Sequence, residues 1–253
     1  NTVSVGSWPS GLAFDSQRRY LYVAQNRSGG GSSGAIQVVD TLSETLVGGT
    51  TLTSGEPGGC VVVSPDDQYV YSLTRKAGSE TLYKIRTSDQ SVTGTLAMPG
   101  AQEPAFSLTP DGLTAYVPNM SSGTIWRVST TTMTKVGEIS APDAQACFVA
   151  PDGTHALVIS ATTTQEDVRV IRLADESTMQ VLSITNVGSV IVGEQRWPVR
   201  WDWQGGAKRV FVPVCSSDGG GVAVLDAYTL SDGLVAYYPF NGNANDASGN
   251  GNN

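Results

Sequence analysis

Short apolar runs that alternate with polar residues recur along the chain, and turns separate them. Five segments share a plan of apolar run, turn and second run rich in Tyr and Val: GLAFDSQRRYLYVAQ, CVVVSPDDQYVYSL, AFSLTPDGLTAYVP, CFVAPDGTHALVIS and VRWDWQGGAKRVFVPV. They recur at intervals of about 40 to 55 residues. Alternation with a period of two, bounded by Pro-Asp, Asp-Gly and Gly-rich turns, is typical of strands. The pattern predicts an all-β repeat protein.

Two further alternating runs complete the repeat. A third run follows every pair (GAIQVVDT, TLYKIRT, GTIWRVST, EDVRVIRLA, GVAVLDAY), and a fourth follows in the first four repeats (ETLVGGTTL, QSVTGTLAM, TKVGEIS, TMQVLSI). Four strands in such a repeat are typical of one propeller blade. The fifth repeat shows no fourth run, and the N-terminal stretch NTVSVGSWP supplies a candidate. We therefore predict a five-bladed β-propeller over residues 1–230, closed by Thr2–Val5 as the outer strand of the last blade.

The remaining residues, 231–253, open with the aromatic run LVAYYPF and continue in Asn, Gly, Ala and Asp. A strand alone is not stable in water. Both faces of this run carry apolar groups, which is typical of a strand buried on two sides. We therefore expect residues 233–240 to form a strand, paired within a second domain or with a neighbouring molecule, and the stretch after it to be irregular.

Two parts of the chain resemble known families. The segments PSGLAFDSQRRYLYVAQN, GAIQVVDT and LTPDGLTAYVPNMSSGTIWRVST resemble the YVTN-type β-propeller repeats of bacterial and archaeal surface proteins, over about residues 1–230. This resemblance implies a propeller with a surface-layer or adhesion role. The tail GLVAYYPFNGNANDASGNGNN is similar to the opening of LamG-like, concanavalin-type jelly-roll domains. That similarity implies that residues 231–253 begin a LamG-like domain, whose first strand is the aromatic run.

Composition narrows the function classes. Charged residues make up 15% of the chain, the net charge is −8, and Lys occurs at only four positions. Without a Lys/Arg stripe, we predict no nucleic-acid partner. The acidic, Ser/Thr/Gly-rich surface favours an extracellular or cell-surface location. No apolar run approaches the length of a membrane span. Cys60, Cys147 and Cys215 lie far apart, so we interpret them as small buried apolar residues.

The motifs that could support catalysis or metal binding are incomplete. Residues 30–34, GGSSG, match G-x-S-x-G but lie in a glycine-rich loop between two strands, where no helix follows. The single histidine, His155, has no evident Ser or Asp partner. Asn241, Asn243 and Asn245 have calcium-loop spacing, but the twelfth position is Asn rather than Glu. We therefore predict that this chain is not an enzyme and that it has no catalytic residue, cofactor or metal. Calcium binding is expected only in a completed second domain.

Acids and indoles stand beside a proline just before the first run of each repeat. In a propeller this connection ends at the mouth of the central channel, so five side chains would ring one opening: Trp8, Glu56, Glu103, Asp143 and Trp197. In one interpretation the prolines only fix the connections and the indoles pack between blades. In the other, the indoles bind sugar rings or a cation, and the carboxylates accept hydroxyl hydrogen bonds or hold a metal. Both interpretations remain open.

Two sequons, at Asn26 and Asn119, are candidate N-glycosylation sites, and each is expected in a loop after a second strand. The function that these observations favour is a non-catalytic extracellular module for recognition, adhesion or rigid spacing, with a glycan or a surface protein as partner. One alternative is a structural subunit of a surface array or fibre, which self-associates through residues 233–240. The other is a lactonase- or lyase-like enzyme that uses the acids at the channel mouth.

Overall fold

The computed structural model describes residues 2–6, 9–25, 34–53, 55–75, 78–101, 105–161, 165–185, 200–202, 209–216, 219–226 and 234–238. The described residues contain strands and turns but no helix, so none of them forms a helix that could cross a membrane. The chain divides into two compact units, residues 1–147 and 148–253. Each unit is described by itself.

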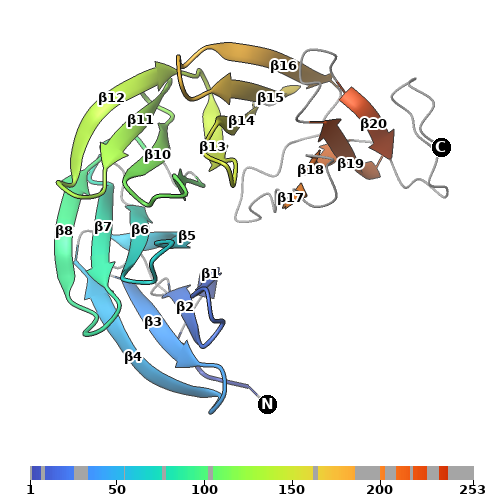
Figure 1. Cartoon of the computed structure of the whole chain (residues 1–253). Helices are drawn as coiled ribbons and strands as arrows, with labels where there is room; N and C mark the ends of the chain where they lie inside the picture. The colour runs from blue at the N-terminus through green and yellow to red at the C-terminus, as the bar shows by residue number, and fades with distance from the viewer. Residues whose placement is uncertain are drawn as a thin grey trace. The chain divides into compact units, whose positions relative to one another are not determined.

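The described strands form five four-stranded antiparallel sheets (Figure 1). The first is β1-β2-β3-β4, with strands Pro9–Phe14, Tyr20–Gln25, Gly34–Asp40 and Thr45–Leu52. The second is β5-β6-β7-β8, with Glu56–Val63, Tyr69–Arg75, Thr81–Arg86 and Val92–Ala97. The third is β9-β10-β11-β12, with Ser107–Leu108, Thr114–Asn119, Thr124–Ser129 and Thr134–Ser140. Sequential order within every sheet confirms the predicted repeat of four strands.

The fourth and fifth sheets follow the same order. The fourth is β13-β14-β15-β16, with Ala144–Val149, His155–Ala161, Gln165–Arg172 and Thr178–Thr185. The fifth is β17-β18-β19-β20, with Arg200–Asp202, Arg209–Ser216, Gly219–Asp226 and Leu234–Tyr238. The architecture is all-β, built from four-stranded antiparallel sheets of the kind that form propeller blades.

The last sheet corrects one prediction. Residues 2–6 lie outside every strand, so Thr2–Val5 is not the outer strand of the last sheet. Instead β20, from the aromatic tail, pairs with β19 through Val222 with Tyr238 and Val224 with Ala236. β20 follows β19 closely in the sequence. Pairing these two strands therefore costs less chain entropy than pairing β19 with residues at the other end of the sequence. The predicted strand in the tail is therefore present over residues 234–238, and its partner lies in the same chain.

Identical hydrogen bonds explain why the same turns recur. After the first strand of each of the first three sheets, a short polar side chain accepts the backbone amide five residues on: Asp15 from Tyr20 (3.0 Å), Ser64 from Tyr69 (2.9 Å) and Thr109 from Thr114 (3.1 Å). A threonine after the third strand then donates to the carbonyl of the turn residue with positive φ: Thr41 to Arg18, Thr87 to Asp67 and Thr130 to Gly112. These bonds fix each hairpin on its neighbour within the sheet.

Burial changes systematically across each sheet. Second and third strands are buried on both faces, as in β10, whereas fourth strands such as β8 keep alternate residues exposed. This pattern is expected when sheets pack face to face. In unit 1, β4, β8 and β12 accordingly lie along one side and β1 and β5 along the other (Figure 1).

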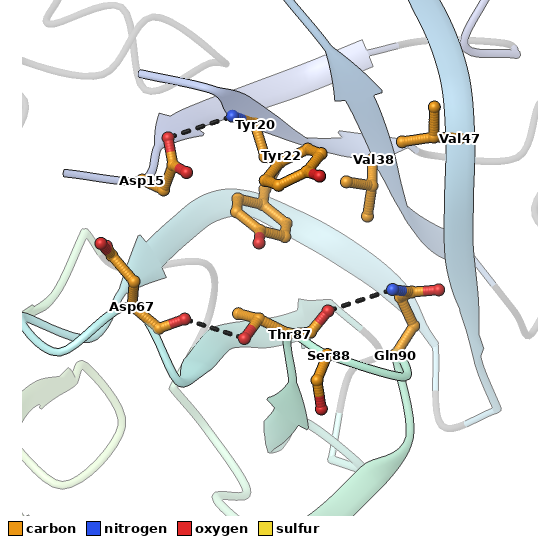
Figure 2. Close-up of a pocket in the computed structure, with 9 residues that line it drawn as sticks. All are labelled: Asp15, Tyr20, Tyr22, Val38, Val47, Asp67, Thr87, Ser88 and Gln90. Carbon is orange, nitrogen blue, oxygen red and sulfur yellow. Dashed lines mark hydrogen bonds between the residues drawn. The ribbon is translucent and has the colours of Figure 1, made fainter. Parts of the chain in front are cut away.

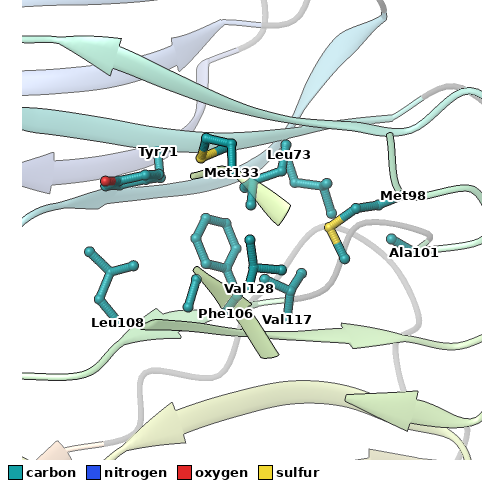
Figure 3. Packing of buried hydrophobic residues seen from close by; sticks show 11 residues of the cluster. Tyr71, Leu73, Met98, Ala101, Phe106, Leu108, Val117, Val128 and Met133 are labelled. Carbon is teal, nitrogen blue, oxygen red and sulfur yellow. The ribbon is translucent and has the colours of Figure 1, made fainter. Parts of the chain in front are cut away.

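Two apolar clusters make up the core between successive sheets of unit 1. One lies between the first and second sheets and includes Tyr22, Ile36, Leu52 and Val70. The other lies between the second and third sheets and packs Tyr71, Leu73, Met98, Phe106 and Met133 together (Figure 3). Burying side chains of this size stabilises the fold by about 1.5 to 3 kcal/mol each. The core therefore holds the sheets against one another face to face.

Candidate functional site

One row of side chains runs across the second, third and fourth strands of each of the first three sheets. Its residues are Tyr22, Val38 and Gly48 in the first sheet, Tyr71, Lys84 and Gly94 in the second, and Tyr116, Arg127 and Gly137 in the third. Tyrosine and glycine are constant, and only the middle residue varies. The row therefore allows the space between one pair of sheets to be compared with the space between the next.

Lys84 fills the space between the second and third sheets. Its Nζ lies 3.9 Å from the centroid of the Tyr69 ring and donates to the Thr130 carbonyl oxygen at 2.8 Å. A cation over an aromatic face and a charge-assisted hydrogen bond are both favourable. Met133 covers the same space from the third sheet, where a Cβ on Gly94 would lie 2.6 Å from its Cγ. A larger residue at position 94 would force the Met133 side chain to shift, because the methionine approaches the backbone so closely.

Val38 leaves the corresponding space open between the first and second sheets. A cavity of about 390 Å³ lies there, lined by Asp15, Tyr20, Tyr22, Val38, Val47, Asp67, Thr87, Ser88 and Gln90. Figure 2 shows the carboxylates of Asp15 and Asp67 on one side of the cavity, Val38 and Val47 on the opposite side, and the tyrosine rings between them. This volume falls in the range of small-molecule sites.

The two carboxylates of the cavity are held by backbone and hydroxyl donors. Asp15 is only 9% exposed, and its Oδ1 accepts the Tyr20 amide. Asp67 lies in the left-handed region at φ 59° and reaches across to the first sheet. There its Oδ1 accepts the Ser16 amide at 2.8 Å, and its Oδ2 accepts the Ser16 hydroxyl at 2.5 Å. Both acids are therefore fixed in position before any ligand arrives.

Polar groups of the second sheet complete the lining. The Thr87 hydroxyl donates to the Asp67 carbonyl at 2.8 Å, and the Thr87 carbonyl accepts Gln90 Nε2 at 3.0 Å (Figure 2). Gln90 has φ 55°, and its side chain lies against Gly48, where a Cβ would come within 2.7 Å of Oε1. Gln90 thus takes the place that Met133 takes between the next two sheets, and it adds an amide to the cavity.

Tyr22 keeps its phenolic proton over the whole physiological range. Burial, together with the negative charges of Asp15 and Asp67, raises the pKa of Tyr22 to about 12. A neutral phenol is a hydrogen-bond donor and presents an electron-rich ring. The cavity therefore combines aromatic rings, fixed carboxylates and the Thr87 carbonyl oxygen. That oxygen accepts one hydrogen bond from Gln90 and has a second lone pair with which it can accept another.

The predicted channel-mouth residues are only partly within the described structure. Trp8, Glu103 and Trp197 lie outside the described residues. Glu56 is the first residue of β5, and Asp143 is exposed with φ 57° in the connection between β12 and β13. The placement of Asp143 between a fourth and a first strand agrees with the predicted connection. A ring formed by the five side chains stays a prediction.

The sequons have different outcomes. Asn26 lies outside the described residues. Asn119 is the last residue of β10 rather than part of a loop, and it is 1% exposed. Its Nδ2 donates to the Pro99 carbonyl at 3.1 Å, and its Oδ1 accepts the Ser122 amide at 3.1 Å. A glycan needs that nitrogen, so the folded geometry speaks against modification of Asn119.

Within the described part of the chain, no group of three or more His, Cys, Asp or Glu side chains could hold a metal ion. The cavity between the first two sheets was not anticipated from the sequence. A signal for it exists, because aligning the repeats sets Val38 against Lys84. The difference between Val38 and Lys84 becomes informative only in the folded structure, where Lys84 links the second sheet to the third.

Comparisons with known proteins place the fold. No family model matches the chain, and no curated protein matches it. Hydrazine synthase of Kuenenia stuttgartiensis is similar in structure, with a TM-score of 0.71, 18% identity, and coverage of 98% of this chain and 71% of that one. The β-propeller domain of Cps50 (Swd1) from Myceliophteria thermophila gives a TM-score of 0.67 at 12% identity, with 92% and 73% covered.

A third similar structure is the dihydro-heme d1 dehydrogenase NirN, with a TM-score of 0.62, 17% identity, and 90% of this chain and 46% of that chain covered. These proteins differ in what they do, so the similarity shows a fold of the β-propeller type and no activity.

Proposed function

We infer that the chain is a non-catalytic β-propeller module of the extracellular space or cell surface, which binds its partner through the cavity between the first and second sheets. The observation that carries this proposal is the set of fixed acceptors in that cavity. Asp15 and Asp67 already accept hydrogen bonds from backbone or hydroxyl donors of the turns, so they are positioned to recognise a ligand.

The finer description of the module follows the sequence. The five four-stranded sheets would be the blades of a five-bladed, YVTN-type propeller, the last of them completed by β20. The LamG-like opening predicted for residues 231–253 would then apply only to the sequence after β20. The acidic composition supports an extracellular or cell-surface location. A glycan or a surface protein is the expected partner, and the Tyr20 ring, 37% exposed, supplies a stacking face for it.

An array of glycans and cell-surface peptides tests the proposed function. We expect the purified chain to bind a subset of the array, and the cavity-filling substitution Val38→Phe to abolish that binding. Leu42→Phe is the matched control, because Leu42 is 75% exposed in the first sheet's β3–β4 turn and does not line the cavity. Binding that survives Val38→Phe would contradict the cavity as the recognition site. Turnover of lactones or esters that Asp15→Asn abolishes would contradict a non-catalytic role.

A second candidate function is assembly through the C-terminal strand, because β20 is an edge strand held by β19. The same strand donated by a neighbouring molecule would form the same pairs and would link molecules into an array. Light scattering separates the two functions: a recognition module stays monomeric, whereas a strand-donating subunit grows with protein concentration.

A further inference from the structure

The space between successive sheets of unit 1 is filled in one case and open in the other. Between the second and third sheets, the ammonium group of Lys84 sits over Tyr69 and donates to the Thr130 carbonyl. The chain thus contains, in its own second sheet, an occupied example of this position.

The same position between the first and second sheets keeps the groups that surround an ammonium but lacks the ammonium itself. Tyr20 is the counterpart of Tyr69, because each donates its amide to the first residue of the turn before it. Thr87 is the counterpart of Thr130, because each hydroxyl donates to the carbonyl of the positive-φ turn residue. Val38 takes the position of Lys84 in the row with the second-strand tyrosine.

Two carboxylates face the open position, whereas one, Asp66, interacts with the charge of Lys84 at the filled position, and Gln17 takes the place of Asp66 in the first sheet. Asp15 stands where the second sheet has Ser64, and Asp67 stands where the third sheet has Gly112. The first substitution replaces a neutral hydroxyl with a carboxylate that is 9% exposed, and the second adds another carboxylate. Charges within a poorly solvated cavity interact more strongly than charges on the surface. None of the described lining residues is a cation; Arg19, whose guanidinium lies 5.7 Å from the Tyr20 ring centroid, is paired with Asp40.

We propose that the cavity between the first and second sheets binds a primary alkylammonium group, which takes the position that Lys84 fills between the second and third sheets. The ammonium lies over the Tyr20 ring, donates to the Thr87 carbonyl beside Gln90, and faces the carboxylates of Asp15 and Asp67. The alkyl chain contacts Val38 and Val47. This inference rests on the proposed function and names the chemistry that the cavity recognises; the ammonium belongs to a lysine side chain or to a free amine.

Titration of the intact chain with n-butylammonium chloride, followed by NMR of backbone amides, tests the proposal. We expect saturable shifts at Tyr20, Thr87 and Gln90, and none with n-butanol, which has the same alkyl chain without the charge. Asp15→Asn should weaken n-butylammonium binding about tenfold, because it removes one of the two negative charges that the ammonium faces in a poorly solvated cavity. Asp175→Asn, at an exposed acid outside the cavity, should leave binding unchanged.

Val38→Lys should abolish binding, because the chain then supplies its own ammonium. Two further probes distinguish the sources of the ammonium. Tighter binding of N-acetyl-lysine-methylamide than of n-butylammonium would identify a protein lysine, and tighter binding of 1,4-diaminobutane would identify a free polyamine. Shifts that n-butanol reproduces, or an affinity unaffected by Asp15→Asn, would overturn the proposal. An array ligand that has no amine and binds the cavity would also overturn it, while leaving the recognition function in place.

Discussion

Lys84 is the residue on which the comparison between the sheets depends. Its ammonium combines a ring contact with Tyr69 and a hydrogen bond to Thr130, each worth about 1 kcal/mol in a half-buried setting. We expect Lys84→Met to lower the free energy of unfolding by about 1 to 2 kcal/mol, measured by urea denaturation. Lys135→Met is the matched control, because Lys135 also lies over a ring, Trp126, but forms an ion pair with the exposed side chain of Glu138. A surface pair contributes little, so equal losses would contradict the account.

Tyr22 and Tyr71 make stability depend on pH in the alkaline range. Burial is the largest cause that raises the pKa of each phenol from 10.0 to about 12. Between these values the unfolded phenol releases its proton while the folded phenol keeps it, so the free energy of unfolding falls as the pH rises. Thermal unfolding measured from pH 10 to pH 12 should show this fall, and Tyr22→Phe should reduce its slope. An unchanged slope in that variant would show that Tyr22 titrates normally.

Cys147 should be unreactive in the folded protein. It is fully buried, and burial raises the pKa of its thiol to about 12, so almost none is present as the reactive thiolate at neutral pH. We expect mass spectrometry after mild alkylation to find Cys147 unmodified in the native protein and modified in urea. The half-buried Cys60 is the internal reference. Rapid native labelling of Cys147 would contradict its position in the core.

At the scale of elements, the repeat of four strands followed from the sequence because each strand carries its own alternation and each turn its own Pro, Asp or Gly. The row of Tyr, variable residue and Gly did not follow, because the significance of Gly48 and Gly94 depends on side chains from the next sheet. The sequence predicts Thr2–Val5 as the outer strand of the last sheet, because the fifth repeat shows no alternating fourth run. The aromatic run after it satisfies the β19 edge instead.

The β19–β20 pairing makes a prediction of its own. Proline lacks an amide hydrogen and disrupts a ladder when placed within a strand, so Ala236→Pro should release β20 from β19. Hydrogen exchange of Val222 to Leu225 should then accelerate, whereas exchange in β2 and β3 should stay slow. Unchanged protection of β19 would mean that another segment covers its edge.

At the scale of the whole molecule, unit 1 is a stack of similar sheets whose differences carry the chemistry. Turns, cores and glycine contacts repeat from sheet to sheet, and this repetition makes a single departure informative. The first sheet departs at Val38 and Asp15, and the second at Asp67; together these residues open and acidify one inter-sheet space. The fold is similar to that of hydrazine synthase and to that of the Cps50 (Swd1) β-propeller domain, so function depends on such local differences.

The central claim is that the space between the first and second sheets is an ammonium position left empty by Val38. A crystal structure of the Val38→Lys variant measures this directly. We expect the introduced Nζ to lie over the Tyr20 ring, within hydrogen-bond distance of the Thr87 carbonyl oxygen and close to the Asp15 carboxylate. An introduced side chain that turns out to solvent, with the cavity still open, would contradict it.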